Sequence, residues 1–225
     1  EGSPIRISSY GDENASRPKI APENGVDGLR GGAVLLYNLE YIEVSDLEVT
    51  NQGDTNADRS GIRIWGDNGE TLDHIYVSNC YVHDVNGIEG QTQEKDLYEN
   101  TDRVTGDYKV THRNGGINMF ADNFTNTTTK FNDVRITHNV IRDCKPNGIS
   151  TINPGAGWET VEQYNTKTYI GYNYIENVSR SGIILLFDDG GLVEHNTIDT
   201  FQTLPGGYGC AIWHGRVRNN ITQFN

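Results

Sequence analysis

Residues 182–198 read Gly-Ile-Ile-Leu-Leu-Phe-Asp-Asp-Gly-Gly-Leu-Val-Glu-His-Asn-Thr-Ile, and both ends of this segment recur along the chain. The glycine-led beginning recurs as Gly61-Ile62-Arg63-Ile64, Gly116-Ile117-Asn118-Met119, Gly148-Ile149-Ser150-Thr151 and Gly209-Cys210-Ala211-Ile212. The asparagine-led end recurs as His138-Asn139-Val140-Ile141, Tyr172-Asn173-Tyr174-Ile175 and Arg218-Asn219-Asn220-Ile221. A repeat of this kind indicates a stacked architecture in which each repeat contacts only its neighbours.

The repeats are predicted to consist of short strands. Apolar residues alternate with period two, as in Ile62/Ile64, Ile75/Val77 and Ile183/Leu185, which is typical of strands with one buried face. Gly, Asn, Asp and Ser bound these runs and indicate turns. No amphipathic helical pattern accompanies them. We therefore predict an all-β, single-stranded parallel β-helix of about six to seven coils, spaced about 4.8 Å apart.

The recurring asparagine is predicted to form a ladder at one corner of the β-helix. An inward-pointing amide there can bond to its equivalents in the coils above and below, and it can satisfy buried backbone groups of the turn. Leu47 and Cys80 fill the same slot in earlier repeats, so the corner also accepts apolar side chains. The alternative is that these residues are simple turn asparagines.

The opening segment carries a resemblance to a known group. Pro4-Ile5-Arg6-Ile7-Ser8-Ser9-Tyr10-Gly11, followed by Arg17-Pro18-Lys19-Ile20, resembles the first coil of right-handed parallel β-helix proteins of the pectin-lyase-like superfamily, bacterial secreted type. The resemblance covers nearly the whole chain. It implies a right-handed β-helix whose substrate groove follows the Gly-led strands and their flanking turns. Because the superfamily holds lyases, hydrolases, esterases and non-catalytic adhesins, the resemblance names no single reaction.

Composition constrains the organisation and the partners. We expect one domain over residues 1–225, with a first coil at 1–31, an inserted loop at 87–115, and a continuation of a longer protein beyond Asn225. The net charge of −13 argues against nucleic acid as a partner. No apolar run is long enough to span a membrane. These features predict a secreted or cell-surface protein whose partner is a polysaccharide.

Acidic residues that follow the Gly-led strands are candidate catalytic groups. Asp122 and Asp188 lie two coils apart in the predicted stack, about 9.6 Å, near the upper end of the separation in inverting glycoside hydrolases. Asp188-Asp189-Gly190 and His214-Gly215 resemble elements of polygalacturonase-like glycoside hydrolases, whereas Asn153-Pro154-Gly155 departs from the Asn-Thr-Asp of that family. This predicts Asp122, Asp188, Asp189 and His214 as catalytic residues. The alternative is that these acids only shape solvated turns.

A lyase would need different residues. Proton abstraction next to a uronic carboxylate requires a base, and Ca²⁺ often neutralises that carboxylate. Lys109, His112, Arg113 and Arg63 are the candidate basic groups, with Asp67 and Asp122 as candidate calcium ligands. The alternative for each is an ordinary solvated charge. A hydrolase, by contrast, would require no cofactor.

Substrate contacts are predicted on the outer side of the Gly-led strands, and the candidates there are Arg63, Trp65, Asn118, Phe120, Asn153 and Trp213, together with Lys109, His112 and Arg113. The tryptophans either stack on sugar rings or form a satellite core beneath the insertion. The sequence thus predicts an extracellular polysaccharide-degrading enzyme, either a glycoside hydrolase or a polysaccharide lyase. The alternative is a non-catalytic carbohydrate-binding module, adhesin or structural β-helix.

Overall fold

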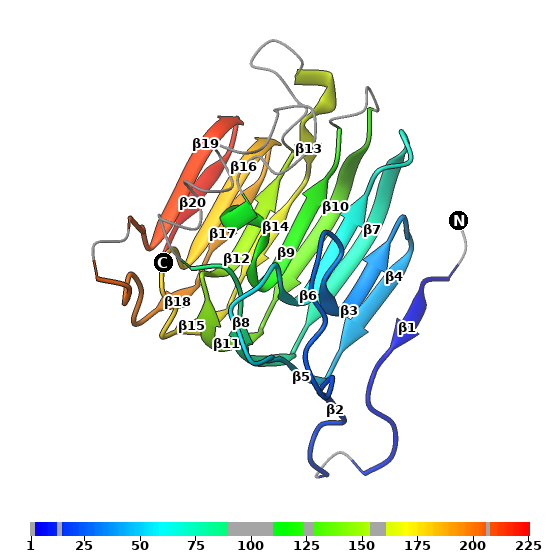
Figure 1. Cartoon of the computed structure of the whole chain (residues 1–225). Helices are drawn as coiled ribbons and strands as arrows, with labels where there is room; N and C mark the ends of the chain where they lie inside the picture. The colour runs from blue at the N-terminus through cyan, green and yellow to red at the C-terminus, as the bar shows by residue number, and fades with distance from the viewer. Residues whose placement is uncertain (1–2, 13–14, 90–109, 124–127, 154–160, 206–207) are drawn as a thin grey trace.

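The computed structural model describes residues 3–12, 15–89, 110–123, 128–153, 161–205 and 208–225. Parallel strands stack coil upon coil into a tube with three faces, and the chain advances along the tube from its N-terminus to its C-terminus (Figure 1). Two of the faces join through β13 into a 14-stranded sheet, and the third is a separate 6-stranded sheet. This architecture is the predicted parallel β-helix.

Each face takes one strand from a coil, except that β13 and β14 of one coil both lie on the second face and both pair with β10. The Gly-led face contains β3 (Gly32–Tyr37), β6 (Ser60–Gly66), β9 (Gly115–Ala121), β12 (Asn147–Ile152), β16 (Ile183–Asp189) and β19 (Ile212–Arg218). The second face contains β1 (Ile5–Ile7), β4 (Ile42–Ser45), β7 (Thr71–Ser78), β10 (Lys130–Thr137), β13 (Asn165–Thr166), β14 (Tyr169–Gly171), β17 (Leu192–Glu194) and β20 (Ile221–Gln223). The third face contains β2 (Lys19–Ile20), β5 (Glu48–Asn51), β8 (Tyr81–Asn86), β11 (Val140–Lys145), β15 (Tyr174–Glu176) and β18 (Thr197–Ile198).

Identical side chains stack along the inside of the tube. Ile62, Ile117, Ile149, Ile183 and Ile212 stand in register on the Gly-led face. The first four have no exposed surface. Each coil therefore buries its aliphatic side chains against the coils above and below, and this burial supplies most of the favourable free energy of folding.

Lack of space requires the glycine near the start of four Gly-led strands, at Gly61, Gly116, Gly148 and Gly182. A Cβ atom built on Gly116 would lie 2.6 Å from Ile141 and 2.7 Å from the Gly148 carbonyl oxygen. The equivalent atom on Gly182 would lie 2.7 Å from Ile198 and 2.6 Å from the carbonyl oxygen of the next coil. The tube is narrow here because the third face turns directly into the Gly-led face. The recurring glycine is thus a packing requirement.

The asparagine ladder is present at the corner between the second and third faces. Asn139 Nδ2 donates to Asn173 Oδ1 at 3.0 Å, and Asn173 Nδ2 donates to Asn196 Oδ1 at 2.9 Å. Asn196 Nδ2 continues the ladder to Asn225 Oδ1 at 2.9 Å. The sequence wrongly predicted Asn219 as the last rung, because Ile221 pairs with Leu192 on the second face and Asn219 therefore lies before that strand.

Two short 3₁₀ helices lie beside the Gly-led strands, η1 (Val110–Arg113) and η2 (Val161–Gln163). η1 leads directly into β9 and closes the predicted insertion, of which residues 90–109 lie outside the described ranges. Within the described part of the chain, no helix is long and apolar enough to cross a membrane.

Candidate active site

The outer side of the Gly-led face is buried, although the alternation pattern places polar residues there. Arg63, Asn118, Ser150, Ile184 and Trp213 form one outward column in register. The first three have no exposed surface. A further layer of side chains and short segments, here called the outer layer, therefore packs on this face. The predicted substrate contacts Arg63 and Asn118 lie inside it.

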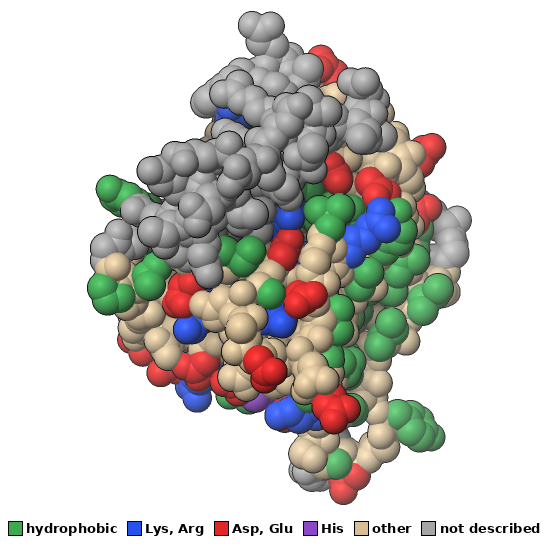
Figure 2. Space-filling view, viewed as in Figure 1, with side chains coloured by type: hydrophobic (Ala, Val, Ile, Leu, Met, Phe, Trp, Pro, Cys, Tyr) green, Lys and Arg blue, Asp and Glu red, His purple; other side chains and the backbone are tan. Residues whose placement is uncertain are grey.

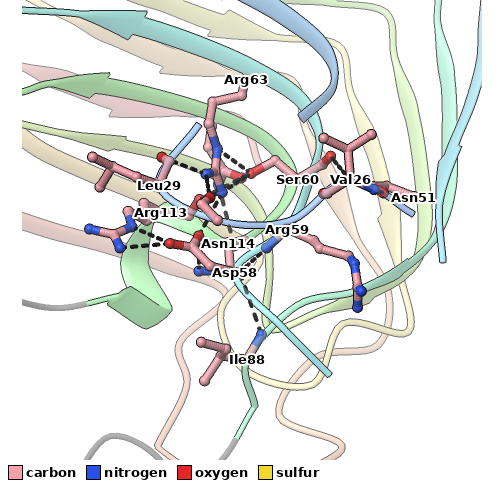
Figure 3. A network of polar contacts seen from close by, with 12 residues as sticks. Val26, Leu29, Asn51, Asp58, Arg59, Ser60, Arg63, Ile88, Arg113 and Asn114 are labelled. Carbon is pink, nitrogen blue, oxygen red and sulfur yellow. Dashed lines mark hydrogen bonds and ion pairs between the residues drawn. The ribbon is translucent and has the colours of Figure 1, made fainter. Parts of the chain in front are cut away.

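Asp58 organises the polar part of the outer layer (Figure 3). Arg63 Nη2 donates to Asp58 Oδ1 at 3.0 Å, while Arg113 Nε and Nη2 donate to Asp58 Oδ2 at 2.9 and 2.6 Å. Arg63 also donates to the carbonyl oxygens of Leu29 at 2.9 Å and of Arg113 at 2.8 Å. Burial lowers the pKa of Arg63, against the opposing effect of Asp58. This hydrogen-bond network connects η1 and the segment before β3 to the Gly-led face.

The aromatic part of the outer layer is a second hydrophobic core. The rings of Trp65 and Phe120 stack with centroids 4.3 Å apart and an interplanar angle of 17°, and neither side chain is exposed. They pack with Ile152, Tyr164, Ile184, Leu186 and Phe187. Of the two sequence interpretations of these aromatic residues, the satellite core is the one found for Trp65. Neither Trp65 nor Phe120 offers a face to a sugar.

Trp213 occupies a different place from the one predicted. The repeat that begins at Gly209 predicted Cys210 as the first inward residue of the last coil, which would place Trp213 opposite Leu186. Instead Ile212 is the first inward residue, and Trp213 pairs with Ile184. The half-buried indole lies edge-on to His112, with ring centroids 5.1 Å apart. These two residues, together with Ile184, Arg180 and Tyr208, line a mostly apolar cavity of about 210 Å³. The structure thus brings the candidates His112 and Trp213 together.

Asp67 and Asp122 are brought together at the other end of the Gly-led strands. They follow the paired residues Gly66 and Ala121, and the Asp122 amide donates to the Gly66 carbonyl oxygen at 2.7 Å. Neighbouring strands lie about 4.8 Å apart. Both acids are partly exposed. Among the sequence-predicted acids, they are the two that directly follow adjacent Gly-led strands.

The environment of Asp67 favours its charged form. Arg30 donates to Asp67 Oδ2 at 2.6 Å, and Tyr37 and Asn38 each donate to Asp67 Oδ1 at 2.9 Å. Burial alone would raise the pKa of this carboxyl, but the three hydrogen bonds outweigh it and hold the pKa below its usual value. Asp67 is therefore a carboxylate at neutral pH.

Asp188 was expected in the groove, but it points into the tube. Phe187 adopts a left-handed backbone conformation with a φ of 55°, as do many corner residues, whose φ values lie between 50° and 59°. This interrupts the alternation, so the Asp188 side chain turns inward and is fully buried. It accepts hydrogen bonds from Thr168 and from Asn220 Nδ2, and burial raises its pKa to about 7. Asp188 and Asp122 do not share an external cleft.

Two further candidates are also displaced. His214 pairs with Leu185 in the inward column of the last coil, where its Nε2 lies 2.7 Å from Thr222 Oγ1, and burial lowers its pKa. Asp189 pairs with Thr166 and Arg218 past the corner and accepts a hydrogen bond from Asn219 at 2.8 Å. The prediction that these two residues converge with Asp122 was wrong, because it extended the strand alternation through a corner.

Asn153 is a structural amide. It is fully buried, accepts from Asn123 Nδ2 at 2.7 Å and donates to the Gln163 carbonyl oxygen at 2.6 Å. Lys109, the remaining basic candidate, lies outside the described residues. Across the described ranges, no three His, Cys, Asp or Glu side chains gather closely enough to hold a metal ion.

Sequence reasoning missed Asp58 and the cavity residues Arg180 and Tyr208. Asp58 stands three residues before Gly61, just as Arg113 stands three before Gly116, and this shared offset was the available signal. Arg180 and Tyr208 lie in turns without a periodic pattern, and only folding places them beside Trp213.

These features define a parallel β-helix whose Gly-led face carries an outer layer, a paired acidic edge and an aromatic cavity. A lacto-N-biosidase of Bifidobacterium longum subsp. longum is 24% identical over 292 residues, which cover 99% of this chain and 18% of that protein. The crystal structure of a GH136 lacto-N-biosidase from Eubacterium ramulus is similar in fold, with a TM-score of 0.66 and 20% identity over 99% of this chain and 45% of that one. No family model matches the chain. The chain thus spans less than half the length of either similar protein.

Proposed function

We propose that this chain forms part of an extracellular glycoside hydrolase that releases lacto-N-biose units from neutral glycans. The sequence similarity to a lacto-N-biosidase extends over nearly the whole chain and supports the substrate class. The observation that carries the reaction is the pair Asp67 and Asp122 on adjacent Gly-led strands. A glycosidase needs two carboxyl groups that flank the bond to be cleaved.

Placement on adjacent strands favours retention of the anomeric configuration. Carboxyl groups that project in parallel from adjacent strands would lie about 4.8 Å apart, close to the separation of about 5–5.5 Å between the carboxyl groups of retaining enzymes. Asp67, kept ionised by Arg30, Tyr37 and Asn38, suits the nucleophile. Asp122 then protonates the leaving oxygen and afterwards activates water. The pair Asp67 and Asp122 takes the place of the pair Asp122 and Asp188 predicted from the sequence, because Asp188 lies inside the tube.

The His112–Trp213 cavity suits one sugar unit of the same glycan. Its apolar lining can contact the apolar face of a pyranose, and His112 and Arg180 at its edge can bond to hydroxyl groups. Three coil steps separate the strand of Trp213 from that of Asp122. The cavity would therefore hold a unit away from the cleaved bond, and Trp213→Ala is expected to raise KM while leaving kcat unchanged.

Hydrolysis is favoured over a lyase reaction by the basic residues. The guanidinium groups of Arg63 and Arg113 both bond to Asp58 inside the outer layer. A base for proton abstraction must instead reach a substrate carbon. Hydrolysis through Asp67 and Asp122 needs no cofactor, and we propose none.

The test is cleavage of p-nitrophenyl lacto-N-bioside by the protein and by Asp67→Asn and Asp122→Asn. Each substitution should lower kcat by at least about 10²-fold, and the first product seen by NMR should keep the anomeric configuration of the substrate. Asp189→Asn, an acid beyond the corner, is the matched control and should retain full activity. Undiminished cleavage by both test variants, with their melting temperatures unchanged, would refute the assignment.

A non-catalytic carbohydrate-binding role has one observation in its favour. The Asp67 carboxylate already accepts hydrogen bonds from three side chains, as an acid that only holds a turn together would. In that case the wild-type protein would bind lacto-N-biose without cleaving the glycoside.

A further inference from the structure

A second hollow follows the corner at which the third face turns into the Gly-led face. Its volume is about 450 Å³, and it is lined by four residues that follow β5 (Gln52, Gly53, Asp54 and Asn56), by the ends of β8 and β11, by the turn after β15 and by Thr203 after β18. In Figure 2, acidic side chains and other polar side chains gather over the part of the view where β8, β11 and β15 lie in Figure 1. We call this hollow the corner groove.

Stacked residues form the floor of the corner groove. Asp84, Asp143 and Asn177 occupy the same place in consecutive coils, each with left-handed backbone at φ 50°, 53° and 53°. The register confirms this alignment, because the residues on either side of Asp84 pair with those on either side of Asp143. The Asn177 amide donates to Asp143 Oδ1. The repeat therefore builds a continuous polar track along the tube axis.

The hydroxyl group of Ser179 is evidence that the corner groove binds a ligand. Only 3% of this residue is exposed, yet it lines the corner groove. Its Oγ has no hydrogen-bond partner among the residues that the structure describes. A buried hydroxyl without a partner costs free energy unless something bonds to it. Because the Oγ atom is itself buried, a ligand hydroxyl or amide in the groove would supply that bond once the Ser179 side chain rotates toward it.

Charge limits the kind of ligand. Asp54, Asp84 and Asp143 line the corner groove, whereas its Lys145 is paired with Glu89 at 3.1 Å. Uronic, sulfated and sialylated glycans would meet net negative charge and be repelled. Carboxylates instead accept hydrogen bonds well from hydroxyl groups. A donor-rich neutral ligand fits this lining.

Shape excludes a single ion as the main occupant. The lining residues come from five successive coils, so the corner groove extends over four coil steps, about 19 Å. Its volume exceeds that of the His112–Trp213 cavity about twofold. Residue 180, which lines that cavity, directly follows Ser179. The groove and the cavity thus lie on either side of one short segment.

We propose that the corner groove binds a neutral oligosaccharide of several sugar units, laid along the tube axis and hydrogen-bonded to Asp84, Asp143, Asn177 and Ser179. This inference rests on the carbohydrate substrate class proposed above, but on none of the residues proposed for cleavage. The groove holds glycan that extends past the His112–Trp213 cavity.

Binding of lacto-N-tetraose and cellotetraose, measured by isothermal titration calorimetry, tests the proposal. Asp122→Asn is the background, so that cleavage neither consumes the ligand nor affects the result. Asp143→Ala with Asn177→Ala should weaken binding of at least one tetrasaccharide by tenfold or more. Ser179→Ala should weaken it by a smaller factor. If the double variant does not fold, Asp143→Leu alone replaces it.

The control is Glu70→Gln, which removes one exposed acidic charge far from the groove and should leave the affinity unchanged. Tetrasaccharide binding that is equal in the wild type and the groove variants would overturn the proposal, even if Asp67 and Asp122 prove catalytic. Binding of Ca²⁺ alone, lost in Asp84→Asn and Asp143→Asn without any tetrasaccharide binding, would also overturn it. Loss of cleavage in the Asp67 and Asp122 variants would not bear on it.

Discussion

The Gly-led face and the third face arise from the same repeat, yet their outer sides differ. Arg63 on the Gly-led face has no exposed side-chain surface and bonds to Asp58. Arg142 on the third face is 43% exposed and pairs with Glu176. Both arginines point outward from a strand. The difference shows that an outward position in a β-helix meets solvent only where no loop or short helix covers the face.

The Asp58 network offers the largest expected effect. Asp58→Asn removes the carboxylate that pairs with both Arg63 and Arg113, and so weakens the compensation of two buried guanidinium groups. Such losses cost about 3–5 kcal/mol. Chemical denaturation should show this drop. Glu176→Gln, which breaks the exposed pair on the third face, should leave the midpoint nearly unchanged, and equal effects would remove the distinction between the faces.

A smaller loss is expected where the two faces meet. Gly116→Ala forces a Cβ atom against Ile141 and the Gly148 carbonyl oxygen, and overpacking of this kind costs about 1–3 kcal/mol. Gly190→Ala is the comparison, because nothing lies within 4 Å of its Cβ and only its φ of 81° opposes the change. Thermal melts should rank Gly116→Ala as the more damaging substitution. The opposite ranking would contradict the packing explanation of the glycine repeat.

Asp188 predicts a pH dependence of stability. Its pKa is about 7 in the folded protein and about 3.9 in an unfolded chain. The folded state therefore holds more protons between these values, and stability should fall as pH rises from about 4 to 7, by at most about 1.4 kcal/mol per pH unit. The free energy of unfolding of Asp188→Asn should depend less on pH across this range than that of the wild type. The same pH dependence in both proteins would contradict a raised pKa at Asp188.

The smallest effect is expected from metal removal. If Asp67 and Asp122 act as a carboxyl pair, EDTA should leave both the cleavage rate and the melting temperature unchanged. Loss of activity on chelation, restored by added Ca²⁺, would return these two acids to the role of calcium ligands considered from the sequence.

The strands, the glycine column and most of the asparagine ladder were predictable because they depend on local alternation and on the repeat. Errors began where a corner or a terminal coil broke the pattern. Phe187 has a left-handed backbone conformation, so that the Asp188 side chain points inward. In the last coil the inward residues begin at Ile212, two positions later than the repeat predicts, and this changes the positions of Trp213 and His214. Alternation cannot report such phase changes, because the first depends on the backbone conformation of Phe187 and the second on the register at which the last coil begins.

The sequence by itself determined the β-helix, since four successive coils carry a glycine at the narrow corner, where there is no room for a Cβ atom, and an amide or apolar group recurs at another corner. It also identified His112, Trp213, Asp67 and Asp122 as residues of interest. Only the tertiary structure decided which of the candidates meet one another and which are buried. That outcome depends on Asp58, η1 and the turns. Their contacts join residues that are far apart in the sequence, and no periodic pattern in the sequence predicts them.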